Sequence, residues 1–268
     1  MIQLTELLKH FEQAWPEGHA EDWDNVGLAV GSKQLEISKV LVAVDLTDSV
    51  IDEAIHLGAN LILTHHPLLL KPIDSVAEDN LKGSLISKLI QNSIALYCAH
   101  TNADVQIDGA SNLMAKAFGL QNEIPLIEAK GGFGHGLLGD LAEPMALSDF
   151  AAKVARSLPA TARKVVFSGN SERLVRRVAV CSGAGDSFLS VVLDSEADVY
   201  VTSDLRHHPA LDAISTPREQ GPLALIDVSH WAAESLWVTS ALSKLSTLSG
   251  IDVVASATVT DPWTQEVN

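Results

Sequence analysis

The sequence predicts a layered α/β protein made of two similar halves. Short apolar segments rich in β-branched residues alternate with segments whose apolar residues recur at helical spacing. This alternation is typical of helices stacked on largely parallel sheets. A strand followed by His-His-Pro occurs once in each half, and so does a strand followed by His-x-x-x-carboxylate. These repeats favour a diverged internal duplication.

The expected elements follow from periodicity and from turn residues. In the first half, helical spacing predicts helices and uninterrupted apolar runs predict strands. The helices are expected over residues 5–15, 49–57, 84–92 and 109–118, and the strands over 40–44, 61–64 and 94–99. A looser stretch with Pro125 comes next, and its glycine-rich part near residues 131–139 is the expected joint. We therefore divide the chain into a first half, residues 1–128, and a second half, residues 129–268, which we expect to pack closely.

The second half repeats the alternation. Its expected strands cover residues 136–141, 164–167, 175–180, 199–202, 223–226 and 251–255, and its helices cover 147–158, 187–193, 209–214 and 232–245. Two of these strands, 199–202 and 223–226, match the strands at 61–64 and 94–99 of the first half in order and spacing. The simplest account is that one ancestral unit was copied and then diverged.

The first repeated motif places paired histidines beyond a strand. In residues 58–68 an apolar strand leads through Thr64 to His65, His66 and a proline. Residues 196–211 repeat this order and end with His207, His208 and a proline. An isolated His-His pair is more often a solvated loop feature. Ligands in α/β sheets nevertheless collect at the carboxyl ends of strands, where two neighbouring imidazoles can hold a metal.

The second repeated motif adds carboxylates. His100 follows the expected strand at 94–99 and Asp104 lies four residues further on, whereas His230 and Glu234 take the same places in the second half. The candidate metal ligands are His65, His66, Asp104, His230 and Glu234. Nitrogen and oxygen ligands without a thiolate suit Zn²⁺, Fe²⁺, Mn²⁺, Co²⁺ or Ni²⁺. Five groups exceed the needs of one catalytic ion, so they favour two ions, with hydrolysis or water addition as the implied chemistry.

Four other residues are candidates for a supporting or substrate-contacting role. Asp45 could orient a ligand imidazole or simply stabilise a helix N-terminus. His100 could point at the site or only close its strand. His207 and His208 could shuttle protons near neutral pH, or they could be relics that lost their function after duplication.

Composition excludes several classes of function. Lysine and arginine number 18 and aspartate and glutamate 34, so 18 − 34 gives the net charge of −16. This charge argues against general nucleic-acid binding, which needs a basic face. Cys98 and Cys181 lie in apolar stretches, which favours a reducing, cytoplasmic compartment. Residues 4–15 read as an amphipathic helix rather than a signal peptide, and no apolar run approaches the length of a membrane span.

Four segments together resemble a known family. They are Trp-Asp-Asn-Val-Gly-Leu-Ala-Val-Gly at 23–31, Thr-His-His-Pro-Leu at 64–68, His-Thr-Asn-Ala-Asp at 100–104, and Asp-Val-Ser-His-Trp-Ala-Ala-Glu at 227–234. In this order they resemble the motifs of the Nif-three-like family, also called the type-2 GTP cyclohydrolase I family, in its short bacterial YbgI-like form. The resemblance extends from about residue 4 to residue 263. His135 departs from the family's usual arginine, and Ser203 from its usual glycine.

The resemblance implies an architecture and a ligand scheme. It implies two intertwined α/β halves and a toroidal homohexamer built from dimers. It also implies a dinuclear centre in which His66 and Asp104 hold one ion, His65 and His230 hold the other, and Glu234 bridges both. The implied activity is hydrolysis of a nucleotide-like substrate such as GTP through a metal-activated water. A non-catalytic metal-binding or delivery protein and a regulatory scaffold remain alternatives, so the enzymatic assignment stays open.

Overall fold

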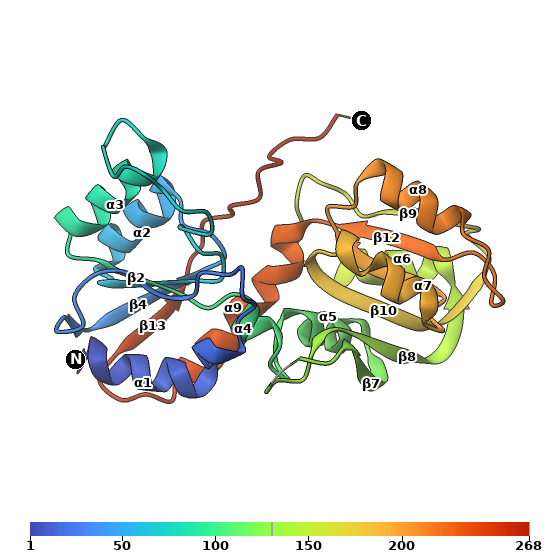
Figure 1. Ribbon diagram of the computed structural model, residues 1–268, viewed down its shortest axis with the longest axis horizontal. Helices are drawn as coiled ribbons and strands as arrows, with labels where there is room; N and C mark the ends of the chain where they lie inside the picture. The colour runs from blue at the N-terminus through green and yellow to red at the C-terminus, as the bar shows by residue number, and fades with distance from the viewer. Residues whose placement is uncertain (130, 268) are drawn as a thin grey trace. The chain divides into compact units, whose positions relative to one another are not determined.

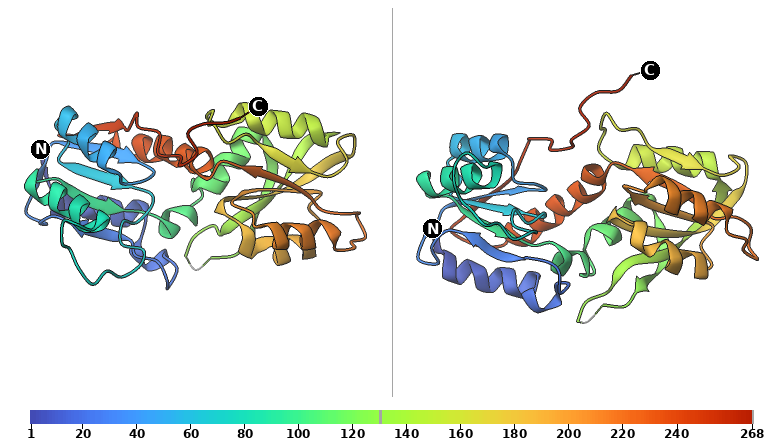
Figure 2. Two further views of the ribbon diagram at one scale, coloured as in Figure 1. Left: turned by 90° about the horizontal axis from the view of Figure 1, so that it is seen from above. Right: turned by 45° about the horizontal axis from the view of Figure 1, so that its top comes forward.

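The computed structural model describes residues 1–129 and 131–267, and Figures 1 and 2 show their course. The chain forms two compact units. The first unit contains Met1–Gln106 and Trp237–Thr260, and the second contains Ile107–Leu236 and the chain from Asp261 onward. The division after residue 128 rests on internal similarity and stays a prediction.

The first unit is built on a five-stranded sheet with the order β13-β4-β5-β6-β2. Its strands are β2 (Gly27–Val30), β4 (Lys39–Ala43), β5 (Leu61–Thr64), β6 (Ala95–Cys98) and β13 (Asp252–Ala255), and a separate pair is formed by β1 (Ile2–Gln3) and β3 (Glu36–Ile37). The four strands β13, β4, β5 and β6 run parallel, and β2 lies antiparallel at the edge. The carboxyl ends of β4, β5 and β6 therefore meet at one edge of the sheet.

Helices bury both faces of this sheet. They are α1 (Leu4–Ala14), η1 (Glu17–His19), α2 (Asp48–Leu57), α3 (Leu81–Gln91), α4 (Thr101–Asp104) and the last part of α9 (His230–Leu245). Helices α2 and α3 cover one face and α1 lies on the other (Figure 1). On the first face, Ile51 and Leu89 pack with strand residues such as Ile62, and all three are fully buried. Thr47 caps the N-terminus of α2, where its hydroxyl accepts a hydrogen bond from the Val50 N–H. Gly58 caps the C-terminus, and its φ of 67° suits glycine.

Glu53 of α2 holds residues 256–258, which follow β13, by hydrogen bonds. Its carboxylate accepts hydrogen bonds from the Ser256 and Thr258 hydroxyls and from the Ala257 N–H. Burial opposes ionisation, but these hydrogen bonds outweigh it and hold the pKa of Glu53 below its ordinary value. The ionised carboxylate therefore stabilises the fold.

Replacing Glu53 with glutamine is expected to lower the free energy of unfolding by about 1.5 kcal/mol at neutral pH. This is the lower end for hydrogen bonds to a charged group, because the carboxylate is partly exposed. Since the folded-state pKa is depressed, the contribution is present above the unfolded pKa near 4.5 and is lost as the pH falls below it. Urea unfolding at pH 7 and near pH 4 measures the difference. Exposed Glu6→Gln is the control, and a difference that grows on acidification would contradict this account.

The second unit is built on a six-stranded sheet with the order β7-β8-β10-β11-β12-β9. Its strands are β7 (Leu120–Ile127), β8 (His135–Ala146), β9 (Val166–Ser168), β10 (Leu174–Ala184), β11 (Val199–Ser203) and β12 (Ala224–Val228). Its helices are α5 (Ala110–Phe118), α6 (Leu147–Ser157), η2 (Asp186–Phe188), α7 (Leu189–Asp194), α8 (His207–Ser215) and the first part of α9. Strands β10, β11 and β12 are parallel, and the others are antiparallel to their neighbours.

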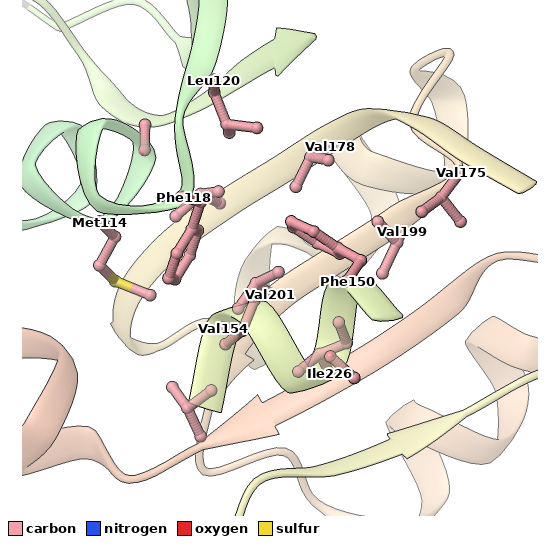
Figure 3. Close-up of a cluster of buried hydrophobic side chains, with 14 of the residues drawn as sticks. Met114, Phe118, Leu120, Phe150, Val154, Val175, Val178, Val199, Val201 and Ile226 are labelled. Atoms are coloured by element: carbon pink, nitrogen blue, oxygen red, sulfur yellow. The ribbon is translucent and has the colours of Figure 1, made fainter. Parts of the chain in front are cut away.

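Both faces of the second sheet are also buried. Helices α5 and α6 cover one face, where the rings of Phe118 and Phe150 meet edge to face at 6.2 Å above Val178 and Val201 (Figure 3). Helices α7 and α8 cover the other face, which includes Tyr200. The sheet's central strands are thereby held rigidly, and their carboxyl ends are fixed in space.

Four neighbouring strands of each sheet follow the same order. An antiparallel edge strand comes first in the chain, three parallel strands follow, and the edge strand pairs with the last of them. The series is β2, β4, β5, β6 in the first unit and β9, β10, β11, β12 in the second. This order is compatible with the duplication, which stays a prediction.

The stretch around Pro125 that the sequence predicts to be loose contains a strand. Residues Leu120–Ile127 form β7, which pairs with β8 and places Pro125 opposite Leu137. The proline is tolerated because β7 is an edge strand. Local sequence suggested a break here, but pairing with a distant strand decides the structure.

Candidate metal centre

His65 follows directly after β5 and is completely buried. Its Nδ1 lies 3.0 Å from the Ala99 carbonyl oxygen, which can only accept a hydrogen bond. Nδ1 therefore carries the proton and the lone pair lies on Nε2. Nε2 is 3.5 Å from Oδ1 of Asp104, at the end of α4. The structure thus brings two of the predicted ligands of the first unit together.

His66 is held by a carboxylate. Its Nδ1 lies 2.7 Å from Oδ1 of Asp45, and the other oxygen of Asp45 accepts from the Thr260 hydroxyl. The Thr64 hydroxyl donates to the His66 carbonyl at 2.9 Å and fixes the turn beyond β5. Asp45 therefore orients the His66 ring so that Nε2 is the nitrogen that points away from the anchor.

His100 follows β6 and is held in the same manner. Its Nδ1 lies 2.9 Å from Oδ1 of Asp24, whose side chain is inaccessible to solvent. Oδ2 of Asp24 accepts from the Thr101 N–H at 3.0 Å and from its hydroxyl at 2.5 Å. Burial would raise the pKa of Asp24, but the hydrogen bonds from His100 and Thr101 prevail and lower it to about 2. Asp24 is therefore an ionised anchor throughout the physiological range.

An aromatic layer supports this edge of the first unit. The ring of Trp237, from α9, lies 4.9 Å from the His65 ring and 5.5 Å from the Trp15 ring, centroid to centroid. Trp237 and Trp15 are almost completely buried. Trp237 therefore packs directly against the ring of His65.

In the second unit His230 and Glu234 form a pair one helical turn apart at the start of α9. His230 Nε2 lies 3.0 Å from Glu234 Oε2, and His230 Nδ1 lies 2.7 Å from Asp204 Oδ2. The hydrogen bond from His230 holds the pKa of Asp204 below its ordinary value against the effect of burial. Arg163 Nη1 lies 3.5 Å from the other oxygen of Asp204. The anchor of His230 is thereby fixed from two sides.

Gly183 makes room for the Glu234 carboxylate. Its φ is +69°, and a Cβ at this position would lie 2.6 Å from Oε1 of Glu234. Any side chain here would displace the carboxylate. The sequence did not identify Asp24 or Asp204 as anchors of the histidines. It left open whether the segments around Asp24 and Gly183 take part in the site.

The second His-His pair lies on a helix. His207 and His208 start α8, are exposed, and have ring centroids 5.1 Å apart. The helix begins two residues earlier than predicted. The roles of His207 and His208 stay predictions.

The two departures from the family pattern both lie at strand ends. Ser203 ends β11 and is buried. His135 starts β8, and the centroid of its ring lies 6.3 Å from that of Phe188.

The donor set in each unit fits a divalent cation. A neutral imidazole lone pair and a carboxylate oxygen are both electron-pair donors. They repel at 3.0–3.5 Å unless a proton or a cation lies between them. A second ring nitrogen anchored to a carbonyl or carboxylate is the usual arrangement of metal-binding histidines. One ring nitrogen from each of His65, His66 and His100 also lies within 4.8 Å of the others, so this group could hold an ion.

These features define an α/β protein with anchored histidines and carboxylates at the carboxyl ends of its parallel strands. The chain belongs to the Duf34/NIF3 (NGG1p interacting factor 3) family, which it matches over residues 2–262. It is 41% identical to a Streptomyces coelicolor protein named GTP cyclohydrolase 1 type 2 homolog, over 100% of this chain and 95% of that protein.

Solved structures agree with this assignment. Staphylococcus aureus protein SA1388 is 30% identical, with a TM-score of 0.85 over 98% of this chain and 99% of its own. Reduced HcgD from Methanocaldococcus jannaschii is 27% identical, with a TM-score of 0.80 over 96% and 98%. The expected family and α/β fold are therefore confirmed. Among the helices in residues 1–129 and 131–267, none is long and apolar enough to span a membrane, as expected.

Proposed function

We propose that this protein binds two divalent ions in one dinuclear centre. His66 and Asp104 hold the first ion, His65 and His230 hold the second, and Glu234 bridges both. The observation that carries the proposal is the anchoring of all three imidazoles through Nδ1, to Ala99, Asp45 and Asp204. This anchoring directs each Nε2 lone pair away from its anchor, as a metal site requires.

The assignment of ligands from both units to one centre rests on the family resemblance, because the motifs that carry these five residues occur here in the family's order.

We further propose that the centre belongs to a hydrolase acting on a nucleotide-like substrate. The relative from Streptomyces coelicolor is named a GTP cyclohydrolase 1 type 2 homolog, which supports this substrate class. Divalent ions at such a site supply an activated water at neutral pH and polarise the substrate. The protein's own part is to orient the ligands, through Asp45, Asp204 and the Ala99 carbonyl, and to hold His65 against Trp237.

Metal content tests the centre directly. We expect elemental analysis of gently purified, metal-saturated protein to find two divalent ions per chain, because five nitrogen and oxygen ligands exceed the needs of one ion. His56→Ala, which removes an exposed histidine of α2, should bind the same amount. One ion per chain at saturation, with all five ligands intact, would refute the dinuclear assignment.

Turnover separates a hydrolase from a metal-delivery protein. The metal-loaded protein is incubated with GTP, other nucleotides and simple phosphoesters, and products are followed by chromatography. Hydrolysis that disappears in His66→Ala supports the hydrolase. Two bound ions that exchange readily, without turnover of any substrate, would favour metal delivery instead.

We also propose a closed homo-oligomer, a hexamer by family resemblance, since closed point groups are usual for homo-oligomers. A charge of −16 makes subunits repel unless apolar contacts outweigh it, and added salt screens that repulsion. The oligomer should therefore persist at high salt. Size exclusion with light scattering measures its mass, and a species near 28.6 kDa at micromolar concentration with metal present would exclude the ring.

A further inference from the structure

We propose that His100 is a further metal ligand, and that His65, His66 and His100 of the first unit hold a single ion together once the ligands of the second unit are removed. This inference rests on the proposed metal centre and extends it by one residue. It needs only the geometry of the first unit, where all three histidines lie. The sequence left His100 as either a site residue or the end of a strand.

The first support is proximity. One ring nitrogen from each histidine lies within 4.8 Å of the other two. The His100 ring stands edge-on to both neighbours, with centroids 5.3 Å from His65 and 5.5 Å from His66 and interplanar angles of 79° and 82°. Three imidazoles gathered in this way can each direct one nitrogen at a shared cation.

The second support is the identity of the nitrogen that can bind. Nδ1 of His100 donates to buried Asp24, just as Nδ1 of His66 donates to Asp45 and Nδ1 of His65 to the Ala99 carbonyl. Each ring is therefore fixed with its lone pair on Nε2. With Nδ1 engaged by its anchor, Nε2 is the nitrogen of each ring that can bind a cation.

The third support is the matching position of His230. His100 follows β6 and His230 follows β12, and each strand is the third of the three consecutive parallel strands. Each histidine lies four residues before a carboxylate, Asp104 or Glu234. Each also donates from Nδ1 to an aspartate far away in sequence, Asp24 or Asp204. His100 thus shares with His230 its place after the strand, its spacing to a carboxylate and its aspartate anchor.

The chemistry follows from the count of donors. Three neutral imidazoles and a nearby carboxylate, Asp104, make a set that suits Zn²⁺ or Co²⁺ and leaves positions for water. This set should retain one ion after His230 and Glu234 are removed. Loss of a residue that only orients a metal ligand lowers metal affinity about 10–100-fold. Removing the His100 imidazole itself should therefore lower the affinity for the ion at least about tenfold.

The test uses the full-length protein and Co²⁺ as the probe. His230→Ala/Glu234→Ala is titrated with Co²⁺ by visible absorption, and X-ray absorption counts the imidazoles on the bound ion. His100→Gln is then added to this background, with His56→Gln as a matched control on an exposed site. Circular dichroism checks that every variant is folded. Asp24→Asn is a second probe, which keeps the His100 side chain but removes the carboxylate that orients its ring.

We expect one Co²⁺ per chain in the double variant, with three imidazoles on the ion. His100→Gln should weaken that binding at least about tenfold and remove one imidazole, whereas His56→Gln should change neither. Unchanged affinity and an unchanged imidazole count in His100→Gln would overturn the inference while leaving the dinuclear centre intact. If unmodified protein bound no Co²⁺ at all, the proposed metal centre would itself be refuted.

Discussion

Replacing Glu234 with alanine is expected to remove more metal than replacing Asp104 with alanine. Glu234 is assigned to both ions and Asp104 to one, so the first change weakens two sites and the second weakens one. The Glu234 carboxylate is nearly buried, lies 3.0 Å from His230 Nε2, and is accommodated by the bare backbone of Gly183. The carboxylate is therefore held beside the imidazole with which it would share an ion.

Residual metal per chain after dialysis against a weak chelator measures this difference. We expect less residual metal in Glu234→Ala than in Asp104→Ala. Without Glu234 both ions lose a ligand and the chelator removes them more easily, whereas Asp104→Ala leaves the second ion with all of its assigned ligands. Glu219→Ala, which removes an exposed carboxylate, is the control and should retain both ions. Equal residual metal in the two ligand variants would remove the basis for a bridging Glu234.

Replacing Trp237 with alanine should lower the free energy of unfolding by about 3–5 kcal/mol, the usual cost of truncating a fully buried tryptophan. Its indole is inaccessible to solvent and fills the space between the rings of Trp15 and His65. The cavity left behind would also release His65, so metal affinity should decrease together with stability.

Urea unfolding followed by circular dichroism tests this effect, with Trp263→Ala as the matched control. The Trp263 side chain is 59% exposed, so its removal should change stability by no more than about 0.5 kcal/mol. A loss below about 1 kcal/mol in Trp237→Ala would show that the aromatic layer does not support the first unit.

The elements that the sequence predicted well are those whose burial is visible locally. Strands β5, β6, β11 and β12 were located within about two residues, because strands buried on both faces form uninterrupted apolar runs. Strands β2 and β7 were missed. Strand β2 is four residues long and begins at a glycine, and β7 contains a proline, so each depends on pairing with another strand.

For the candidate metal centre too, the sequence predicted the local features and missed those that depend on contacts between distant residues. The sequence by itself determined the family, the α/β class and the five candidate ligands, because ligand chemistry depends on residue type and on short spacings along one strand end or one helix face. The anchors were decided only by tertiary structure. Asp24 and His100 are 76 residues apart, and Asp204 and His230 are 26 apart, so no local pattern relates them. Strand pairing and helix packing bring these carboxylates to the ring nitrogens, and those contacts set which nitrogen of each histidine can bind a metal.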